Sequence, residues 1–469
     1  MLVVSTDDGR VIASGSDAHE VKGEGGARET DPRAWERSVA NALAQTGQAS
    51  ELAAISVGGQ QHGLVVLDGA GRPLRPAPLW NDTRSAADAR ALVEALGGPD
   101  ACAKRVGSVL TMSFTVTHWA WLRRTEPAVA DATRHVLLPH DYMNLRLTGN
   151  YATDRSDVSG TGWWSPAEEA YAEDVLGLGA VQLSPELLPQ VVGPTEAAGS
   201  VTPEAAELFG LPAGAPVACG AGDNAAAALS LGLGPGEVAI SLGTSGTVYT
   251  ISEQPSVDET GTVAGFASAD GRFLPLTATI NATVAVDRTA EWLGLRRDDV
   301  VPSAGVVFLP WLGGERTPNV PNASGSLTGL RYGTDTRSVL QAAYEGIVAT
   351  LLDAKDCLAR WAPLSPGAPL LLLGGGARGE TWQQTVLRLS GHPVVLVEQP
   401  ELVAYGAAVQ AGALVTGASL SEVAQAWGGR RGELLQAVAK DEETLARIAW
   451  WRGHVMASVG EAPPQPKLA

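Results

Sequence analysis

The decisive stretch of this sequence is CGAGDNAAAA, residues 219–228, in which two glycines precede Asp223 and an alanine run follows it. Alanine has the highest helix propensity, so the run predicts a helix that begins near Asp223 and Asn224. The first turn of a helix leaves backbone N–H groups without partners, and the helix dipole favours negative charge there. We therefore expect the helix N-terminus to hold the pKa of Asp223 low. The alternative is that Asp223 only caps the helix.

A second stretch, VAISLGTSGTVYTIS at residues 238–252, follows after a short connection. It predicts two strands joined by a Gly-Thr-Ser-Gly turn at residues 243–246. Such a turn exposes backbone N–H groups and hydroxyls that suit a phosphate, although it also occurs as an ordinary hairpin loop. A carboxylate that accepts a proton and a turn that holds a phosphate together favour phosphoryl transfer.

Composition limits the classes of protein that this chain can belong to. Its 469 residues exceed what one core usually supports, so two domains are expected. The 51 acidic and 33 basic residues give a net charge of −18, which argues against nucleic acid or an anionic membrane as a partner. The three cysteines show no disulfide framework or metal spacing. Because no signal peptide and no apolar run near 18 residues is visible, we expect a cytoplasmic protein.

Strand and helix patterns alternate along both halves of the chain, which predicts an α/β fold in two domains. The turn-rich joint at residues 233–236 sets the expected boundary. One domain is therefore predicted at residues 1–232 and the other at residues 233–469.

Several individual elements can be placed from their patterns. Residues 1–15 predict a β-hairpin, residues 53–57 a strand, and the periodic segment 336–361 a long helix. A weak internal repeat relates the strand at residues 247–251 to residues 2–6. In the second half this strand follows the Gly-Thr-Ser-Gly turn, so the repeat predicts that the first half starts one strand late.

Seven ordered blocks of sequence resemble a known family. They are Gly59-Gln60-Gln61-His62-Gly63, Leu79-Trp80-Asn81-Asp82-Thr83-Arg84, Leu137-Leu138-Pro139-His140-Asp141-Tyr142, Gly222-Asp223-Asn224-Ala225-Ala226, Ser241-Leu242-Gly243-Thr244-Ser245-Gly246, Gly314-Glu315-Arg316-Thr317-Pro318 and Gly374-Gly375-Gly376-Ala377-Arg378. Through these blocks the chain resembles the FGGY carbohydrate kinases over nearly its whole length, and within them the members that act on D-xylulose. One glycine turn would be weak support, whereas seven blocks in order are specific.

The resemblance implies two actin-like (ribonuclease H-like) domains, the N-terminal one binding sugar and the C-terminal one binding nucleotide, with both ligands in the cleft between them. It implies transfer of the γ-phosphate of ATP to the 5-hydroxyl of D-xylulose. Members of the family usually begin with a strand that ends in an Asp-x-Gly-Thr loop, whose Asp helps position Mg²⁺. No such sequence precedes Leu2 here. Either the true start lies upstream or the element is lost, and the persistence of the other blocks favours the first explanation.

Asp223 is the predicted general base, because an ionised carboxylate can take the proton of an attacking hydroxyl. Gln61 and His62 are predicted sugar contacts, since an amide and a neutral imidazole both donate and accept hydrogen bonds. Members of the family that act on D-xylulose often carry Met at the position of Gln61, which leaves the sugar preference open. The alternative for His62 is a structural histidine bonded to a loop carbonyl.

The other predicted sugar-binding residues combine an apolar face with polar groups, and are Trp80, Asn81, Asp82, Arg84 and Asn224. Two alternatives are open here. Trp80 would instead belong to a core, and Arg84 would only pair with Asp82.

The predicted ATP-binding residues lie in two turns. Gly243, Thr244 and Ser245 are expected to face the β- and γ-phosphates through N–H and hydroxyl groups. The resemblance assigns a second turn to adenosine and the α-phosphate, at Gly374, Gly375, Gly376 and Ala377. Its alternative is a plain connection between a strand and a helix. Mg²⁺ is expected as a cofactor because phosphoryl transfer needs charge neutralisation, but no protein ligand for it can be named.

Two other functions stay open on the sequence alone. The chain could be a related ketose or polyol kinase of the same family, or a catalytically impaired, truncated member that binds sugar only. The expected partners are D-xylulose and ATP, without nucleic acid or a membrane. The sequence does not decide the oligomeric state, and a homodimer is common among similar enzymes.

Overall fold

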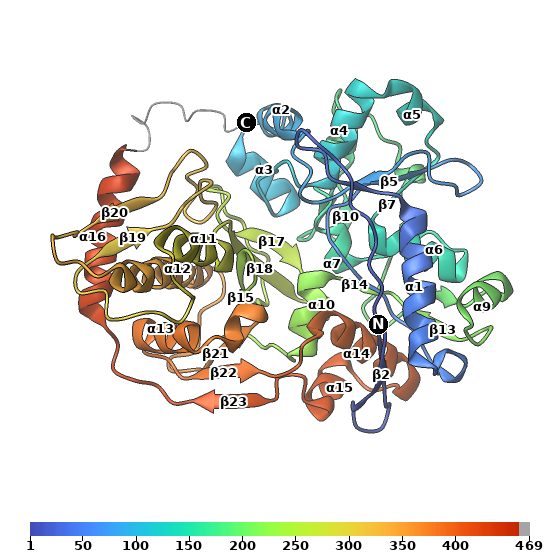
Figure 1. Cartoon of the computed structure of the whole chain (residues 1–469). Helices are drawn as coiled ribbons and strands as arrows, with labels where there is room; N and C mark the ends of the chain where they lie inside the picture. The colour runs from blue at the N-terminus through green and yellow to red at the C-terminus, as the bar shows by residue number, and fades with distance from the viewer. Residues whose placement is uncertain (459–469) are drawn as a thin grey trace. The chain divides into compact units, whose positions relative to one another are not determined.

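The computed structural model describes residues 1–458 (Figure 1). The chain forms two compact units. The first contains Met1–Leu233, Ser252–Leu274 and Glu401–Arg430, and the second contains Gly234–Ile251, Pro275–Pro400 and the chain from Arg431 onward. The boundary between the sugar-binding domain and the nucleotide-binding domain, placed between residues 232 and 233, stays a prediction. Two later segments of the chain join the first compact unit.

The first unit is a mixed α/β structure with short strands. Its helices are α1 (Pro32–Thr46), α2 (Ala86–Ala95), α3 (Pro99–Val106), α4 (Thr115–Thr125), α5 (Pro127–Ala132), α6 (Pro139–Thr148), α7 (Arg155–Val158), α8 (Glu173–Leu176), α9 (Pro203–Phe209), α10 (Asp223–Ser230), α14 (Leu402–Thr416) and α15 (Leu420–Trp427). Its paired strands are β1 (Leu2–Val4) with β2 (Val11–Ser14), β3 (Glu29–Thr30) with β6 (Ala77–Pro78), β4 (Gly58–Gly59) with β14 (Ala221–Gly222), β5 (Val65–Leu67) with β7 (His135–Leu137), β8 (Ala152–Asp154) with β11 (Gln190–Val192), β9 (Trp164–Ser165) with β10 (Ala170–Tyr171), and β12 (Ala197–Ser200) with β13 (Pro216–Ala218).

The start of the chain folds largely as its pattern predicts. Strands β1 and β2 confirm the hairpin at residues 1–15. The expected strand at residues 53–57 is not continuous, because only Ile55 forms a bridge there, to Val217. Residues 53–57 also line a cavity of about 610 Å³, together with residues 1–6.

Helix α10, which carries Asp223 at its first position, packs against α14 (Figure 1). The two backbones approach very closely: a Cβ atom added to Gly406 would lie 1.8 Å from the carbonyl oxygen of Ala226. Only glycine fits at this position of α14, and alanines occupy the facing positions of α10. Small residues on both helices therefore fix the place of α10 within the first unit.

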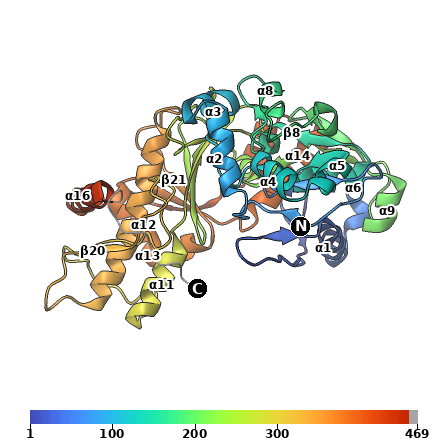
Figure 2. The same cartoon turned by 90° about the horizontal axis from the view of Figure 1, so that it is seen from above.

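The second unit is built around one sheet. The strands of this sheet that follow β17 (Ala264–Ala267) in order are β18 (Phe273–Thr279), β16 (Gly246–Thr250), β15 (Val238–Leu242), β21 (Leu370–Leu373), β22 (Val394–Val397) and β23 (Gly432–Leu435). Its helices are α11 (Thr283–Leu293), α12 (Thr336–Leu358), α13 (Glu380–Ser390) and α16 (Glu442–Ser458), and a separate pair of strands is β19 (Val307–Leu309) and β20 (Ser326–Thr328). Figure 2 shows α11, α12 and α13 as neighbours, in agreement with their contacts.

The register of two central strands positions the loops that follow them. Strand β15 pairs in parallel with β21, and Ser241 lies opposite Leu373. Because the carboxyl ends of parallel strands meet at the same edge of a sheet, the turn after Leu242 and the turn after Leu373 lie next to each other.

The long helix α12 ends at Leu358, three residues before the predicted end.

Two expectations about the chain as a whole can be compared with the structure. Cys102 and Cys219 are buried free thiols, in agreement with the expected lack of a disulfide framework. Within residues 1–458 no single helix has the length and apolar content to cross a membrane. Helices α14 and α15 pass that test only as a pair, which is bent by 118° at the break.

Candidate active site

Asp223 is the first residue of α10, as the sequence predicts, and Gly222 is the N-cap. Its Oδ1 accepts two hydrogen bonds from the next residue, from the backbone N–H of Asn224 at 2.7 Å and from Nδ2 of Asn224 at 2.8 Å. Both of these bonds reach Oδ1. The carboxylate is therefore oriented by its neighbour, and Oδ2 is the oxygen that can accept a proton from a substrate.

The expectation that the helix N-terminus holds the pKa of Asp223 low is wrong. Burial raises the pKa of this carboxyl above its ordinary value of 3.8, and the hydrogen bonds from Asn224 offset only part of that effect. The physical reason is that the carboxylate loses its hydration among packed neighbours, which disfavours its charged form. A raised pKa makes the ionised group a stronger base.

Gln61 lies beside the residue that precedes Asp223. Its side chain is buried, and a Cβ atom added to Gly222 would lie 2.8 Å from its Cγ. Ser156 links the two segments, because its carbonyl oxygen accepts from Nε2 of Gln61 at 3.2 Å and its hydroxyl accepts from the N–H of Gly222 at 3.2 Å. The structure thus brings Gln61 to the start of α10. Ser156 is a residue that the sequence analysis missed, since it lies outside the seven blocks.

His62 makes the contact that the structural alternative describes. Its Nδ1 lies 2.6 Å from the carbonyl oxygen of Gly160, so Nδ1 carries the hydrogen, and its backbone has a φ of 72°. The ring packs against Phe114 and Phe266, with centroid distances of 4.9 and 5.7 Å. A contact between His62 and a sugar stays a prediction.

The segment from Trp80 to Arg84 combines exposed and buried side chains. Trp80 is 49% exposed, so the alternative that it belongs to a core is wrong, and Asn81 is also exposed. Asp82 is buried and pairs with Arg84, whose guanidinium also pairs with Glu29. This confirms the pairing of Arg84 with Asp82, and sugar binding by the segment stays a prediction.

In the second unit, the turn after β15 is exposed at Thr244 and Ser245. It is held by backbone groups: the N–H of Gly243 donates to the carbonyl of Ser245 at 3.0 Å, and the N–H of Thr283 donates to the carbonyl of Gly243 at 3.1 Å. Thr283 is the first residue of α11. The turn therefore presents its hydroxyls beside the N-terminus of a helix, an environment that suits an anion.

The second predicted nucleotide turn lies against the first. Gly374 follows β21 with a φ of 89°, and a Cβ atom added to it would lie 2.7 Å from the carbonyl oxygen of Leu242. A Cβ atom added to Gly376 would lie 3.0 Å from the Cβ of Leu242. Within the second unit the structure therefore brings together the two turns that the sequence assigned to ATP.

A cavity of about 950 Å³ opens beside the second turn. It is lined by Arg378 and residues 379–381, which directly follow the turn, and by residues 300–304 and Gln341. Its volume lies at the upper end of the range for pockets that hold small ligands. The cavity is large enough for the base and ribose of a nucleotide.

Glu315 belongs to one of the seven blocks but had no predicted role. It is buried, and its carboxylate accepts from the N–H of Ile280 at 2.6 Å and from Nδ2 of Asn281 at 3.0 Å. These residues directly precede α11. Glu315 therefore fixes the start of the helix that supports the turn at residues 243–245.

Comparisons with known proteins agree with this geometry. Residues 1–230 match the N-terminal domain of the FGGY family of carbohydrate kinases, and residues 238–415 match its C-terminal domain. The chain belongs to the FGGY family of carbohydrate kinases. As a member of that family it is an ATP-dependent sugar kinase with two actin-like domains, which confirms the predicted fold class.

Individual FGGY kinases are similar to this chain over most of its length. A xylulose kinase of Streptomyces coelicolor is 56% identical over 450 residues, which cover 95% of this chain and 92% of that protein. A xylulose kinase of Streptomyces rubiginosus is 55% identical, with coverage of 96% and 92%. The crystal structure of xylulose kinase from Bifidobacterium adolescentis matches with a TM-score of 0.83 at 30% identity and covers 96% of each chain.

Proposed function

We propose that this FGGY kinase transfers the γ-phosphate of ATP to the 5-hydroxyl of D-xylulose, with Asp223 as the general base. The observation that carries the proposal is the oriented carboxylate of Asp223 at the start of α10, in a chain that is 55–56% identical to two xylulose kinases. The alternatives of another ketose, a polyol, or sugar binding without catalysis have no observation in their favour.

Asp223 is suited to proton transfer by its geometry. Asn224 holds Oδ1, so Oδ2 takes the proton from the sugar hydroxyl as that hydroxyl attacks the γ-phosphorus. Because burial raises the pKa of Asp223, the ionised carboxylate accepts this proton more readily than an exposed aspartate would. The O–H bond of the sugar breaks, the new P–O bond forms, and ADP leaves.

We assign the sugar contacts to the first unit. Gln61 beside Gly222 lies next to the base, and its amide can both donate and accept hydrogen bonds. Exposed Trp80 offers an apolar ring to the carbon skeleton. Asp82 is buried and its oxygens accept from Arg28 and Arg84, so its role is to hold the guanidinium of Arg84, which is partly exposed and donates to a sugar hydroxyl.

We assign ATP to the second unit. The turn at residues 243–245 offers N–H and hydroxyl donors to the β- and γ-phosphates, and Gly374–Ala377 let the nucleotide approach the backbone closely. Adenosine fits the cavity of about 950 Å³ beside this turn. Mg²⁺ would arrive on the phosphates of ATP, where it neutralises charge, and we assign it no protein ligand.

The experiment is an ADP-release assay with purified protein against D-xylulose, D-ribulose, other ketoses and glycerol. We expect D-xylulose to give the highest kcat/KM and the product to carry phosphate on O5. A higher kcat/KM for glycerol or another ketose would replace the proposed substrate. Thermal stabilisation by sugar without any ADP release would identify a member that only binds. A homodimer and a cytoplasmic location stay predictions.

A further inference from the structure

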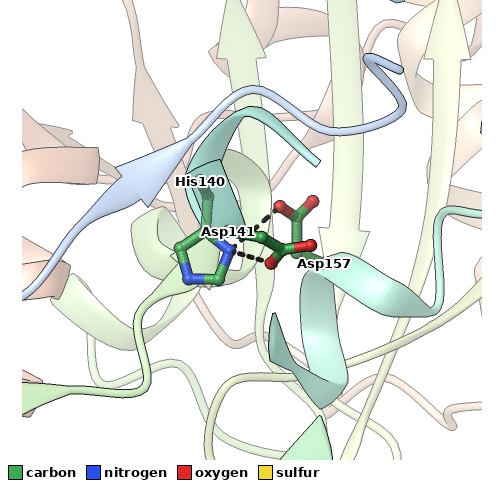
Figure 3. A group of neighbouring side chains, drawn as sticks. All are labelled: His140, Asp141 and Asp157. Atoms are coloured by element: carbon green, nitrogen blue, oxygen red, sulfur yellow. Dashed lines mark ion pairs between the residues drawn. The ribbon is translucent and has the colours of Figure 1, made fainter. Parts of the chain in front are cut away.

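A cluster of ionisable side chains lies buried in the first unit and has no part in the proposed reaction. His140 and Asp141 come from α6 and Asp157 comes from α7, and all three side chains are at most 1% exposed (Figure 3). Nδ1 of His140 lies 2.9 Å from Oδ1 of Asp141 and 3.3 Å from Oδ2 of Asp157. Figure 3 shows both carboxyl groups directed at this one nitrogen.

The opposite nitrogen of His140 fixes the protonation of the ring. Nε2 lies 2.8 Å from the carbonyl oxygen of Cys219. A carbonyl only accepts, so Nε2 carries a hydrogen. If Nδ1 carried none, its lone pair would face Oδ1 of Asp141 at 2.9 Å in a buried site, and a proton on Asp157, whose Oδ2 lies farther away at 3.3 Å, would not relieve that contact. Both nitrogens therefore carry hydrogens, and His140 is an imidazolium.

The surrounding charges support this assignment. Burial alone would lower the pKa of His140, but hydrogen bonds and charge from Asp141 and Asp157 raise it well above its ordinary value. Burial also raises the pKa of Asp157, to about 8. The other titratable groups nearby are Asp154 and the Cys219 thiol, and burial raises the pKa of each.

The carbonyl that His140 holds belongs to the segment that leads into Asp223. Gly220 follows it with a φ of 86°, and a Cβ atom there would lie 2.2 Å from Nε2 of His140. Nδ2 of Asn144 donates to the same Cys219 carbonyl at 2.9 Å. Asp223 lies four residues after Cys219, so the position of the Cys219 carbonyl is one of the points that fix the path of the backbone into α10.

We propose that His140 is a positioning residue for the general base: as an imidazolium held by Asp141 and Asp157, it fixes the Cys219 carbonyl and thereby the carboxylate of Asp223. This inference rests on the proposed role of Asp223. A displacement of about 1 Å in a reacting group can cost roughly 100-fold in rate, so loss of this contact should lower kcat.

The first test compares H140Q with wild-type enzyme in the ADP-release assay. Glutamine keeps a donor for the Cys219 carbonyl but removes the charge. We expect kcat to fall roughly 10- to 100-fold while the KM values for D-xylulose and ATP change less than about twofold. H135Q is the matched control, because His135 is a half-buried histidine of the same unit that stacks on Tyr151 and has no link to Asp223. A change in KM with kcat retained would overturn the proposal.

A double variant tests whether His140 acts through Asp223. In an Asp223→Asn background the base is absent, so adding H140Q should lower the residual rate less than about twofold. An equal loss in both backgrounds would show that His140 acts by another route and would overturn the proposal. Full activity of Asp223→Asn alone would instead refute the proposed base, so the two failures are distinguishable.

Two further measurements keep the inference testable if H140Q folds poorly. H140K keeps a cation with several donors, and we expect its kcat to exceed that of H140Q and its alkaline loss of activity to shift to higher pH. In wild-type protein labelled with ¹⁵N-histidine, NMR at neutral pH should show both nitrogens of His140 protonated. A neutral ring would overturn the proposal.

Metal analysis, together with the His140 NMR signals, distinguishes a proton on Nδ1 of His140 from a bound metal ion. One nitrogen and two carboxyl oxygens within 4.8 Å of one another form a set that could hold a metal ion. We expect metal analysis of the purified protein to find none in stoichiometric amount. A bound metal that a chelator removes, with a change in the His140 resonance, would overturn the assignment of an imidazolium.

Discussion

The two units hold the segments assigned to the proposed active site by different kinds of contact. In the first unit, side chains hold the segment before Asp223: His140 and Asn144 bind one carbonyl, Gln410 donates to the carbonyl of Gly220 at 2.9 Å, and Ser156 accepts from Gly222. In the second unit, the turn at residues 243–245 is held mainly by backbone hydrogen bonds, and the neighbouring turn is made of glycines.

The difference follows from what each end must do. A general base needs one oxygen at one place, and only specific side chains can orient it. A phosphate is bound by several N–H groups at once, which the backbone supplies wherever side chains do not block it. The comparison is therefore tested by a change of functional group at Asp223 in the first unit and by an added Cβ atom in the glycine turn of the second unit.

The largest effect is expected for Asp223→Asn. Asparagine has nearly the shape of aspartate, and Asp223 is the first helical residue rather than the N-cap, so stability should change little, whereas loss of the base should lower kcat about 10²- to 10⁴-fold. ADP release and thermal unfolding measure the two quantities. Retained activity would show that Asp223 is not the general base.

The pH dependence of kcat sharpens this test. Burial raises the pKa of Asp223 above 3.8, and the base works only when ionised. The rate should therefore fall as the pH falls through a value above 3.8, in a range where the protein is still folded. An acid limb at or below 3.8 would contradict the raised pKa.

The next largest effect is expected for Gly374→Ala in the second unit. Its φ of 89° strains any residue with a side chain, and the new Cβ atom would lie 2.7 Å from the carbonyl oxygen of Leu242. We expect the KM for ATP to rise about tenfold and the free energy of unfolding to fall by about 1–3 kcal/mol. Gly333→Ala is the matched control, because Gly333 is an exposed glycine of the same unit outside the proposed site and nothing lies within 4 Å of its added Cβ atom. Equal effects of both variants would contradict the importance of the backbone path.

A smaller effect is expected for Trp80→Ala. Because Trp80 is 49% exposed, its loss should change the free energy of unfolding by less than about 0.5 kcal/mol. Loss of an aromatic contact with the sugar should raise the KM for D-xylulose roughly three- to tenfold. Trp450→Ala, at an exposed tryptophan of α16, serves as the control. An unchanged KM would remove Trp80 from the sugar site.

The smallest expected effect is on the pH dependence of stability. The folded-state pKa values of His140 and Asp157 are both raised, so folding favours their protonated forms. Their contribution to stability should therefore fall as the pH rises: the part from Asp157 is lost between its ordinary pKa of 3.8 and about 8, and the part from His140 is lost from its ordinary pKa of 6.5 upward. Asp157→Asn mimics the protonated carboxyl and should make this decline shallower in denaturant titrations. An unchanged slope would contradict the raised pKa of Asp157.

Local chemistry determined much of this protein from the sequence alone. The alanine run fixed the start of a helix at Asp223, and the strand-turn-strand pattern fixed the turn at residues 243–245, because both depend on neighbouring residues. The seven blocks identified the family for the same reason: each is a short contiguous stretch. The α/β fold in two actin-like domains could therefore be predicted from the sequence.

Long-range packing decided the rest. No local pattern shows that His140, Asp157 and the Cys219 carbonyl meet, since they lie up to 79 residues apart in the chain. The same is true of the pKa of Asp223: the helix N-terminus predicted a lowered value, and burial among distant segments raised it. Burial is a property of the whole unit, so the sequence identified Asp223 as the proposed base, but only the tertiary structure raises its pKa and holds its carboxylate in place.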